Sequence, residues 1–411
     1  MFSKKLQYEC KTDYPAIFLG ASLNSCHVGR FVVYNFSGIN DYKKFPEAEV
    51  AKGEETFTFA QATDEANSLN LPEWWPIKNK RYDFAEAMEK SKTVAFIVIR
   101  NDSILYEEYF NGYDRESIVT SFSVVKSFVS ALMGIAIEEG YVDSVNDPIT
   151  KYLDYLEDPA FAKITIEHVL NMESGIDFNE SYYSPFSDAA KFYYGRQLEK
   201  YLTKLEVARP PGESFQYRSV NTVLLAQIIE KATGMPLNEY MTTRLWEKLD
   251  TEYPASLSMD KKNGIAKAFA GLNARAIDFA KFGRLFLNEG KWEGEQIVPV
   301  DWVRKSGQLD AGKDFHQYSY QWWKPRYYQT YSDTVTYTEP YRIVDSSSGN
   351  GQLVVKPVDY YSAVGHLGQY IAVVPGKNMI AVRFGKKEGK LDWYRLMQWI
   401  AANNNNGKGS G

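Results

Sequence analysis

The sequence has few cysteines and no long apolar run. Its 411 residues include two cysteines, Cys10 and Cys26. A disulfide between them is expected if the protein is exported, and two free thiols are the alternative, so both stay open. No apolar stretch approaches the roughly 18 residues of a membrane span, and the N-terminal residues lack the apolar core of a signal peptide. We therefore expect no membrane span, and a protein that is cytoplasmic if the chain is full length, or periplasmic or secreted if it is a trimmed mature form.

The sequence also lacks the charge pattern and the motifs of several functional classes. Its net charge is −5 and no basic run stands out, so nucleic-acid binding has no electrostatic support. It contains no His-Glu-x-x-His, paired Cys-x-x-Cys, phosphate-loop or dinucleotide-binding motif, and no Gly-x-Ser-x-Gly motif of an α/β-hydrolase. The four histidines are scattered, at His27, His168, His316 and His366. We therefore expect neither a metal nor another cofactor.

The composition predicts a packed chain with distinct parts. Apolar residues make up 44% and charged residues 24%, which favours a core over disorder. Residues 1–80 differ in character and form an N-terminal extension of unknown role, with a short alternating stretch at 29–36. Residues 81–402 form the main domain, in which about 141–300 are a helical subdomain, and 403–411 form a flexible tail.

Two β-hairpins are predicted at opposite ends of the main domain. The apolar run 93–100 is followed by a turn and an alternating run at 104–110, and the runs 369–374 and 379–384 flank a Pro-Gly-Lys-Asn turn. Strands at both ends, with helices between them, indicate one sheet built from distant segments. Further helices are predicted at 83–91, 221–232, 237–249, 276–288 and 391–402.

Ser123 and Lys126 stand at the start of an apolar run with helical spacing that stops at Gly140. Residues three apart share a helix face, so Lys126 can lie beside the Ser123 hydroxyl, and a serine beside a base is a potential nucleophile. From the spacing alone, a helix-start serine with a surface lysine remains the alternative. A second Ser-x-x-Lys, Ser258 to Lys261, lies in a polar stretch without an apolar helix behind it.

Two further motifs complete a pattern. Tyr217, in Tyr-Arg-Ser-Val-Asn-Thr, lies just ahead of an amphipathic helix, and Gly365-His-Leu-Gly-Gln369 opens a strand. With Leu-Asn-Met-Glu-Ser-Gly-Ile-Asp at 170–177, the chain resembles serine hydrolases of the class C β-lactamase and penicillin-binding-protein-like group over roughly residues 80–400. Within that group it is most similar to the esterases and amidases related to 6-aminohexanoate-dimer hydrolase.

The resemblance implies a role for each matching residue. Ser123 is the acylated nucleophile, and Lys126 and Tyr217 share the proton transfers. A lysine ammonium near a tyrosine hydroxyl favours tyrosinate, and partial desolvation is expected to bring both pKa values nearer to neutral. Which of the two accepts the proton first stays open, because they titrate as a coupled pair. The oxyanion hole uses the backbone N–H groups of Ser123 and Gln369, and Gly368 lets the strand approach the substrate.

Two positions depart from β-lactamases of this type. Ser219 stands two residues after the tyrosine where asparagine is usual, and His366-Leu-Gly368 replaces Lys-Thr-Gly. That lysine helps bind the carboxylate of a β-lactam, whereas a histidine is mostly neutral near pH 7. Ser219, His366 and Gly368 are therefore the expected substrate-binding residues of an enzyme that favours esters or small amides. An equally favoured alternative is that His366 is a neutral hydrogen-bonding residue that shapes the edge of the sheet and does not contact the substrate.

We predict an α+β fold: an antiparallel sheet flanked by N- and C-terminal helices, with an inserted all-helical subdomain. The expected function is a serine hydrolase that cleaves a small-molecule ester or amide through an acyl-serine intermediate. The alternatives are a D-peptidase or β-lactamase and, in another class, a non-catalytic ligand-binding or sensing protein. The Tyr- and Trp-rich stretch 318–328 and the loop after it are expected to rim the pocket. The acyl group, the leaving group and the oligomeric state stay open.

Overall fold

The computed structural model describes residues 27–34, 36–63, 69–77, 80–307, 318–324 and 360–404. Cys10 and Cys26, the loop after residue 324 and the tail beyond residue 404 lie outside these ranges, and so do the predictions made for them. Within the described ranges, no helix has both the length and the apolar character needed to cross a membrane.

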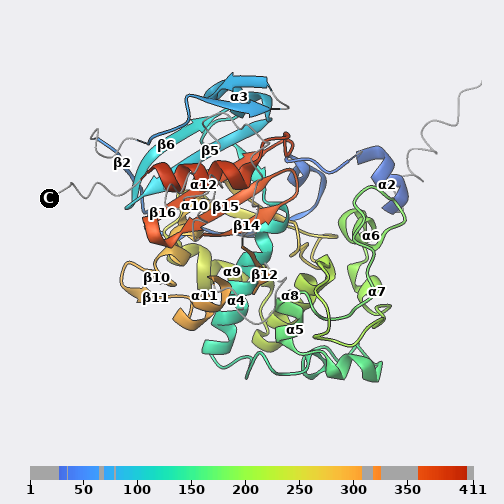
Figure 1. Ribbon diagram of the computed structural model, residues 1–411. Coiled ribbons are helices and arrows are strands. Elements are labelled where there is room, and N and C mark those ends of the chain that lie inside the picture. The colour runs from blue at the N-terminus through green and yellow to red at the C-terminus, as the bar shows by residue number, and fades with distance from the viewer. Residues whose placement is uncertain are drawn as a thin grey trace, which may run out of the picture.

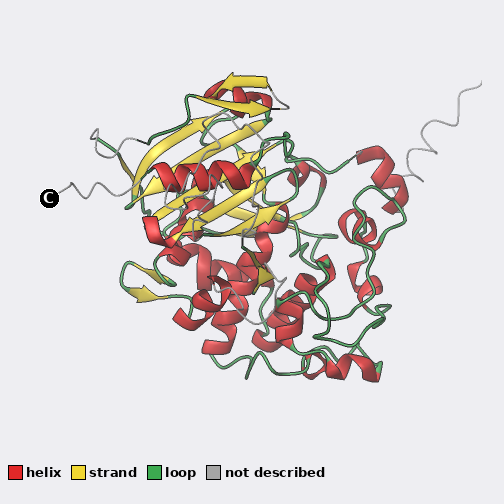
Figure 2. Cartoon of the chain, viewed as in Figure 1, coloured by secondary structure: helices red, strands yellow, loops and turns green. Residues whose placement is uncertain are grey.

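The largest sheet has eight strands. It occupies one end of the molecule, and most of the helices gather at the other (Figure 2). Both predicted hairpins are confirmed, and β16 of one pairs with β5 of the other. The pairings are antiparallel except that β2 joins β6 in parallel. The strand order is β12 (Tyr318–Ser319), β13 (Trp322–Trp323), β14 (Tyr361–Gly365), β15 (Gln369–Val374), β16 (Met379–Gly385), β5 (Thr93–Arg100), β6 (Ser103–Tyr109) and β2 (Ala60–Gln61).

Helices cover both faces of this sheet (Figure 1). Every residue of β5 is buried, and successive side chains point to opposite faces. Phe96 packs with α3 (Phe84–Lys90) and α12 (Trp393–Asn403), whereas Ile97 belongs to the core on the side of α10 (Ala276–Leu287). The predicted sheet flanked by N- and C-terminal helices is therefore confirmed.

The helical part packs behind α10. Phe128 of α4 stacks on Phe282 of α10 with ring centroids 3.6 Å apart, and α4 also packs on α8. Helix α8 ends at Gly234, whose φ of 69° is left-handed and favours glycine. The helices of this part are α4 (Val125–Glu138), α5 (Ile166–Leu170), α6 (Asp188–Tyr194), α7 (Leu198–Leu202), α8 (Ser219–Thr233), α9 (Leu237–Met241) and α11 (Val300–Gly307).

A second, four-stranded sheet joins the N-terminal segment to the main domain. Its order is β1 (Glu47–Val50), β8 (Ala255–Ser258), β9 (Leu272–Arg275) and β7 (Ile118–Thr120). The alternating stretch 29–36 contributes most of a helix, α2 (His27–Tyr34). Since β1 and β2 both pair with strands of the main domain, two strands from residues 1–80 are built into its sheets. A domain boundary near residue 80 stays a prediction.

The remaining elements are short. Trp75, which is fully buried, lies in the hairpin of β3 (Trp74–Ile77) and β4 (Lys80–Asp83) and packs in the layer of α3 and α12. The others are β10 (Lys291–Trp292), β11 (Glu295–Gln296), the π-turn η6 (Thr242–Trp246) and the 3₁₀ turns η1 (Asp41–Lys44), η3 (Phe122–Val124), η4 (Ile149–Lys151), η5 (Pro159–Lys163), η7 (Glu247–Leu249) and η9 (Pro375–Lys377).

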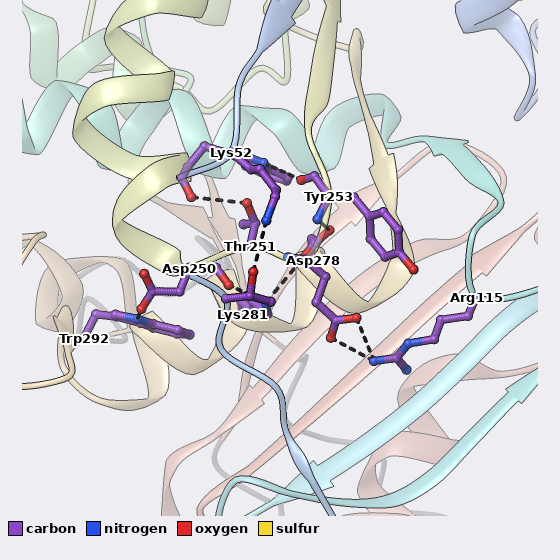
Figure 3. Close-up of polar contacts among 11 residues, drawn as sticks. Lys52, Arg115, Asp250, Thr251, Tyr253, Asp278, Lys281 and Trp292 are labelled. Carbon is purple, nitrogen blue, oxygen red and sulfur yellow. Dashed lines mark hydrogen bonds and ion pairs between the residues drawn. The ribbon is translucent and has the colours of Figure 1, made fainter. Parts of the chain in front are cut away.

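A buried ion pair on α10 connects this helix to residues 250–253, which precede β8 (Figure 3). Asp278 and Lys281 are both fully buried, with 3.6 Å between Lys281 Nζ and Asp278 Oδ1. Asp278 accepts the N–H groups of Glu252 and Tyr253 at 2.7 and 3.2 Å, and Lys281 donates to the Asp250 carbonyl at 2.7 Å. Burial raises the pKa of Asp278 to about 6 although Lys281 favours its charged form.

Replacing Lys281 with methionine should lower the free energy of unfolding by about 3–5 kcal/mol, because the Asp278 carboxylate would stay buried without its cation. Urea unfolding followed by circular dichroism measures the change. The control is Lys151→Met, which removes a lysine paired with Asp143 and Asp147 at the surface and should change the stability little. Equally small effects of both substitutions would contradict a structural role for the buried pair.

Candidate active site

Ser123 lies in η3, the turn that leads from β7 into α4. Its neighbour Phe122 has a φ of 46°, a strained conformation that recurs at functional sites. The end of β14 packs directly against this turn. A Cβ at Gly365 would lie 2.5 Å from the Ser121 carbonyl oxygen and 3.2 Å from the Ser123 nitrogen, so only glycine lets the sheet edge approach Ser123 this closely.

Lys126 is 1% exposed, and its ammonium nitrogen is surrounded by three oxygen atoms. Its Nζ lies 2.9 Å from Ser123 Oγ, 3.3 Å from Ser219 Oγ and 2.7 Å from the Phe269 carbonyl oxygen. The aromatic rings of Tyr217 and Phe269 enclose it at 5.2 and 5.7 Å. Burial lowers the pKa of Lys126 to about 7, and the Glu180 carboxylate opposes that shift.

Glu180 orients the hydroxyl of Ser219, the first residue of α8. Its carboxylate accepts the Ser219 N–H at 2.8 Å, the Ser219 hydroxyl, and the Tyr182 hydroxyl at 2.6 Å. Because the single proton of Ser219 Oγ points to Glu180, this oxygen must accept a hydrogen bond from Lys126. The carboxylate also lies at a helix N-terminus, where negative charge is favoured.

Tyr217 departs from the expectation that its pKa would approach neutral. Burial raises its pKa well above the usual value, a hydrogen bond with Ser123 lowers it, and Glu180 adds to the rise. Its ring packs against Tyr318 and Trp323, with centroids 5.9 and 5.5 Å apart. These rings remove the hydroxyl from water, and desolvation disfavours tyrosinate. Tyr217 is therefore a neutral phenol near pH 7.

The third motif lies at the β14–β15 turn. His366 packs edge-on against Phe122 at 5.4 Å, and burial lowers its pKa. The Gln369 side chain donates to the Gly385 carbonyl and accepts the Gly385 N–H, each at 2.8 Å, which fixes the start of β15. Gly368 has a φ of 76°, and the Arg383 guanidinium fills the space beside it. The turn and Arg383 thus explain the glycine at 368.

A pocket of about 40 Å³ opens beside Ser123 and Ser219, and His366 is among the residues that line it. Aromatic side chains dominate the described part of its wall: Phe122, Tyr182, Tyr193, Tyr194 and Phe269. Tyr318 and Trp323, from the stretch expected to rim the pocket, instead pack behind Tyr217. In the described ranges, no group of three or more His, Cys, Asp or Glu is placed to hold a metal ion.

The structure thus brings Ser123, Lys126, Tyr217 and Ser219 together, and His366 lines the same pocket as Ser123 and Ser219. Glu180 and the Phe269 carbonyl were not predicted from the sequence. Glu180 is a lone carboxylate in a Tyr-rich loop, and a backbone carbonyl has no sequence signature. Gln321 was missed as well: it holds β12 and β13 against the helices by donating to the Leu170 carbonyl at 2.8 Å and accepting from Thr222 at 2.9 Å.

Comparisons with known proteins identify the family and the fold of the chain. The Beta-lactamase family model matches residues 83–397. The 6-aminohexanoate-dimer hydrolase of Paenarthrobacter ureafaciens is 32% identical over 263 residues, which cover 59% of this chain and 66%, just under two thirds, of that protein. A Bacillus anthracis structure provisionally assigned as a 6-aminohexanoate-dimer hydrolase has a TM-score of 0.70 at 22% identity, covering 90% of this chain and 91% of that one. A Bacillus halodurans penicillin-binding protein has a TM-score of 0.55 at 16% identity, covering 77% and 99%. At these identities the two structures show the fold alone.

Replacing Glu180 with glutamine should lower the pKa of Lys126 below about 7, because the substitution removes a negative charge that favours the ammonium. NMR titration of ¹³C-labelled lysine side chains measures the shift, with Lys126→Met identifying the signal. Lys267 is an internal control, since burial also lowers its pKa to about 7 but Asp260 is the carboxylate that opposes the shift. A Lys126 signal that does not respond to Glu180→Gln would contradict this electrostatic coupling.

Proposed function

The chain belongs to the Beta-lactamase family, and we propose that it is a serine hydrolase that cleaves an ester or amide bond through an acyl-serine intermediate. The direction of the hydrogen bonds around Lys126 carries this proposal. The Phe269 carbonyl can only accept, and Ser219 Oγ must accept because its own proton goes to Glu180. A neutral Lys126 has two protons for these two acceptors, so its lone pair is left facing Ser123.

Lys126 is then the base that activates Ser123. A serine hydroxyl is a poor nucleophile at neutral pH and needs an adjacent base. With a pKa of about 7, Lys126 is substantially unprotonated near neutral pH and close to the value at which a general base is most effective. As Ser123 Oγ forms its bond to the substrate carbonyl carbon, its proton passes to Lys126 Nζ, 2.9 Å away.

Tyr217 acts as a proton donor and relay. Since burial keeps its pKa high, it enters the reaction as a phenol whose hydroxyl is hydrogen-bonded to Ser123. The proton taken from Ser123 reaches the leaving oxygen or nitrogen from Lys126, directly or through Tyr217, as the carbonyl–heteroatom bond breaks. In the second half, water attacks the acyl carbon and gives a proton to Lys126. Lys126 passes that proton to Ser123 Oγ as the bond between Ser123 and the acyl carbon breaks and the acid departs.

The backbone N–H groups of Ser123 and Gln369 are the proposed oxyanion hole. A Cβ built on Gly365 would lie 3.2 Å from the Ser123 nitrogen and 3.1 Å from the Gln369 Cβ, so both residues adjoin the same point of the sheet edge. Loss of one such donor typically costs about 3–4 kcal/mol of transition-state stabilisation.

Two observations favour an esterase or amidase over a β-lactamase or D-peptidase. The relative from Paenarthrobacter ureafaciens is a 6-aminohexanoate-dimer hydrolase. Burial also lowers the pKa of His366, so this residue offers no positive charge for a substrate carboxylate at neutral pH. Ser219 and His366 line the pocket and are proposed to contact the substrate, while a contact with Gly368 rests on the family resemblance.

Incubation with 4-nitrophenyl acetate and 4-nitrophenyl butyrate should release a burst of nitrophenol and add one acyl group to the protein, as measured by intact mass. Ser123→Ala removes the nucleophile, so we expect it to abolish the burst and the mass increase and to lower kcat by about 10³-fold or more. A mass increase that persists in Ser123→Ala would contradict the assignment of Ser123. Inactivity of both proteins toward a wide ester and amide series would favour a ligand-binding protein instead.

A further inference from the structure

The pocket beside Ser123 carries no formal charge on its described lining. None of those residues is an aspartate, glutamate, lysine or arginine. His366 is neutral because burial lowers its pKa, and Tyr193 stays protonated because burial raises its pKa. A charged group that entered the pocket would lose its hydration without touching an opposite charge on this lining, which is costly. The Glu180 carboxylate lies behind the lining and already accepts hydrogen bonds from Ser219 and Tyr182.

The pocket is also small. Its volume of about 40 Å³ holds roughly three water molecules, at the ~10–15 Å³ that each requires. Helix α6 forms one side of it through Ala189, Ala190, Tyr193 and Tyr194. On this side the pocket can widen only if α6 moves.

Residues 36–45, here called the N-terminal wall, reach the pocket at Ser37. Ser37 lines the pocket, although the family match begins only at residue 83. The Thr120 N–H donates to the Ile39 carbonyl at 3.0 Å, which ties the wall to β7 just ahead of Ser123. The N-terminal wall therefore lies outside the residues that the family model matches.

The N-terminal wall also holds α6 in place. The Tyr193 hydroxyl donates to Asp41 Oδ2 at 2.8 Å. Asp41 is 2% exposed and pairs with Lys44 at 2.8 Å. Just before the wall, Arg30 of α2 donates to the Tyr194 carbonyl, and α2 lies beside α6 (Figure 1).

A buried lysine fixes the C-terminal end of α6. Lys267 is 1% exposed and donates to the carbonyls of Phe192 and Gly195 at 3.0 and 3.3 Å. Since α6 is bonded both to the N-terminal wall and to Lys267, widening the pocket would break buried hydrogen bonds.

We infer that the pocket beside Ser123 accepts a compact, uncharged acyl group, and that the N-terminal wall sets this limit. The inference rests on the proposed function, because the acyl group is the part of the substrate that stays attached to Ser123 while the leaving group departs. Esters and amides of short neutral acids are then the substrate class. Acyl chains that end in an ammonium or a carboxylate are excluded.

The charge limit is tested by binding, without turnover. Pentanamide and 4-aminobutyramide have the same chain length and end in a methyl group or an ammonium. NMR titration of the Ser123→Ala variant gives both dissociation constants, and we expect pentanamide to bind about tenfold or more tightly than 4-aminobutyramide. Equal affinities, or tighter binding of the ammonium compound, would overturn the uncharged class even if the ester assays succeed.

The wall is tested with Ser37→Trp, which fills the pocket from the N-terminal side. We expect the ratio of kcat/KM for 4-nitrophenyl butyrate to that for the acetate to fall by about tenfold. Ala162→Trp, at an exposed position on η5, is the control and should leave this ratio unchanged. Ser37→Leu serves if circular dichroism shows that the tryptophan variant is misfolded. An unchanged ratio in the folded Ser37 variant would overturn the role of the wall.

The two tests separate this inference from the proposed function. If the wild-type protein turns over no ester, the proposed function fails, and the wall is then tested by the affinity of butyramide for Ser123→Ala with and without Ser37→Trp. A loss of affinity of about tenfold would support the wall, and an unchanged affinity would overturn it.

Discussion

The site depends above all on the desolvation of one amine. Lys126 is enclosed by aromatic rings and by the core, so its ammonium form is destabilised and its pKa falls to about 7. The pKa of Lys126 does not fall further because the Glu180 carboxylate stabilises the ammonium form. Without burial, Lys126 would stay protonated at neutral pH, and Ser123 would have no base. Burial also raises the pKa of Tyr217, because its charged form is the tyrosinate, and so the phenol keeps its proton.

The fold supplies this environment by joining segments that are far apart in sequence. The strand that ends at Gly365 comes from the C-terminal part of the chain, yet it touches the turn that carries Ser123 because β16 pairs with β5. Helix α8 brings Ser219, and the loop before α6 brings Glu180. The polar network forms only when α4, α8 and the loop before α6 pack together, so the chemistry of the site depends on the tertiary structure.

The residues closest in sequence were the easiest to predict. Ser123 and Lys126 lie side by side because residues three apart share one face of a helix. Both hairpins were predicted from runs of strand length and from the turn residues between them. Contacts that depend on tertiary packing could not be predicted. Glu180, in the loop before α6, contacts Ser219 at the start of α8. The rings that bury Tyr217, and so raise its pKa, come from β12 and β13. The stretch 29–36 alternates like a strand, yet it contributes to α2, whose Arg30 reaches a carbonyl on α6.

The pH dependence of kcat/KM for 4-nitrophenyl acetate tests the central claim most directly, because this parameter reports the ionisation of the free enzyme. If Lys126 must be unprotonated to accept the Ser123 proton, kcat/KM should rise with pH through an apparent pKa of about 7. Below that pH it should fall by about tenfold per unit, with the rate of Ser123→Ala subtracted as background. A profile that does not change between about pH 5 and 9, or one that rises only near the ordinary lysine pKa of about 10.4, would contradict the assignment of Lys126 as the base.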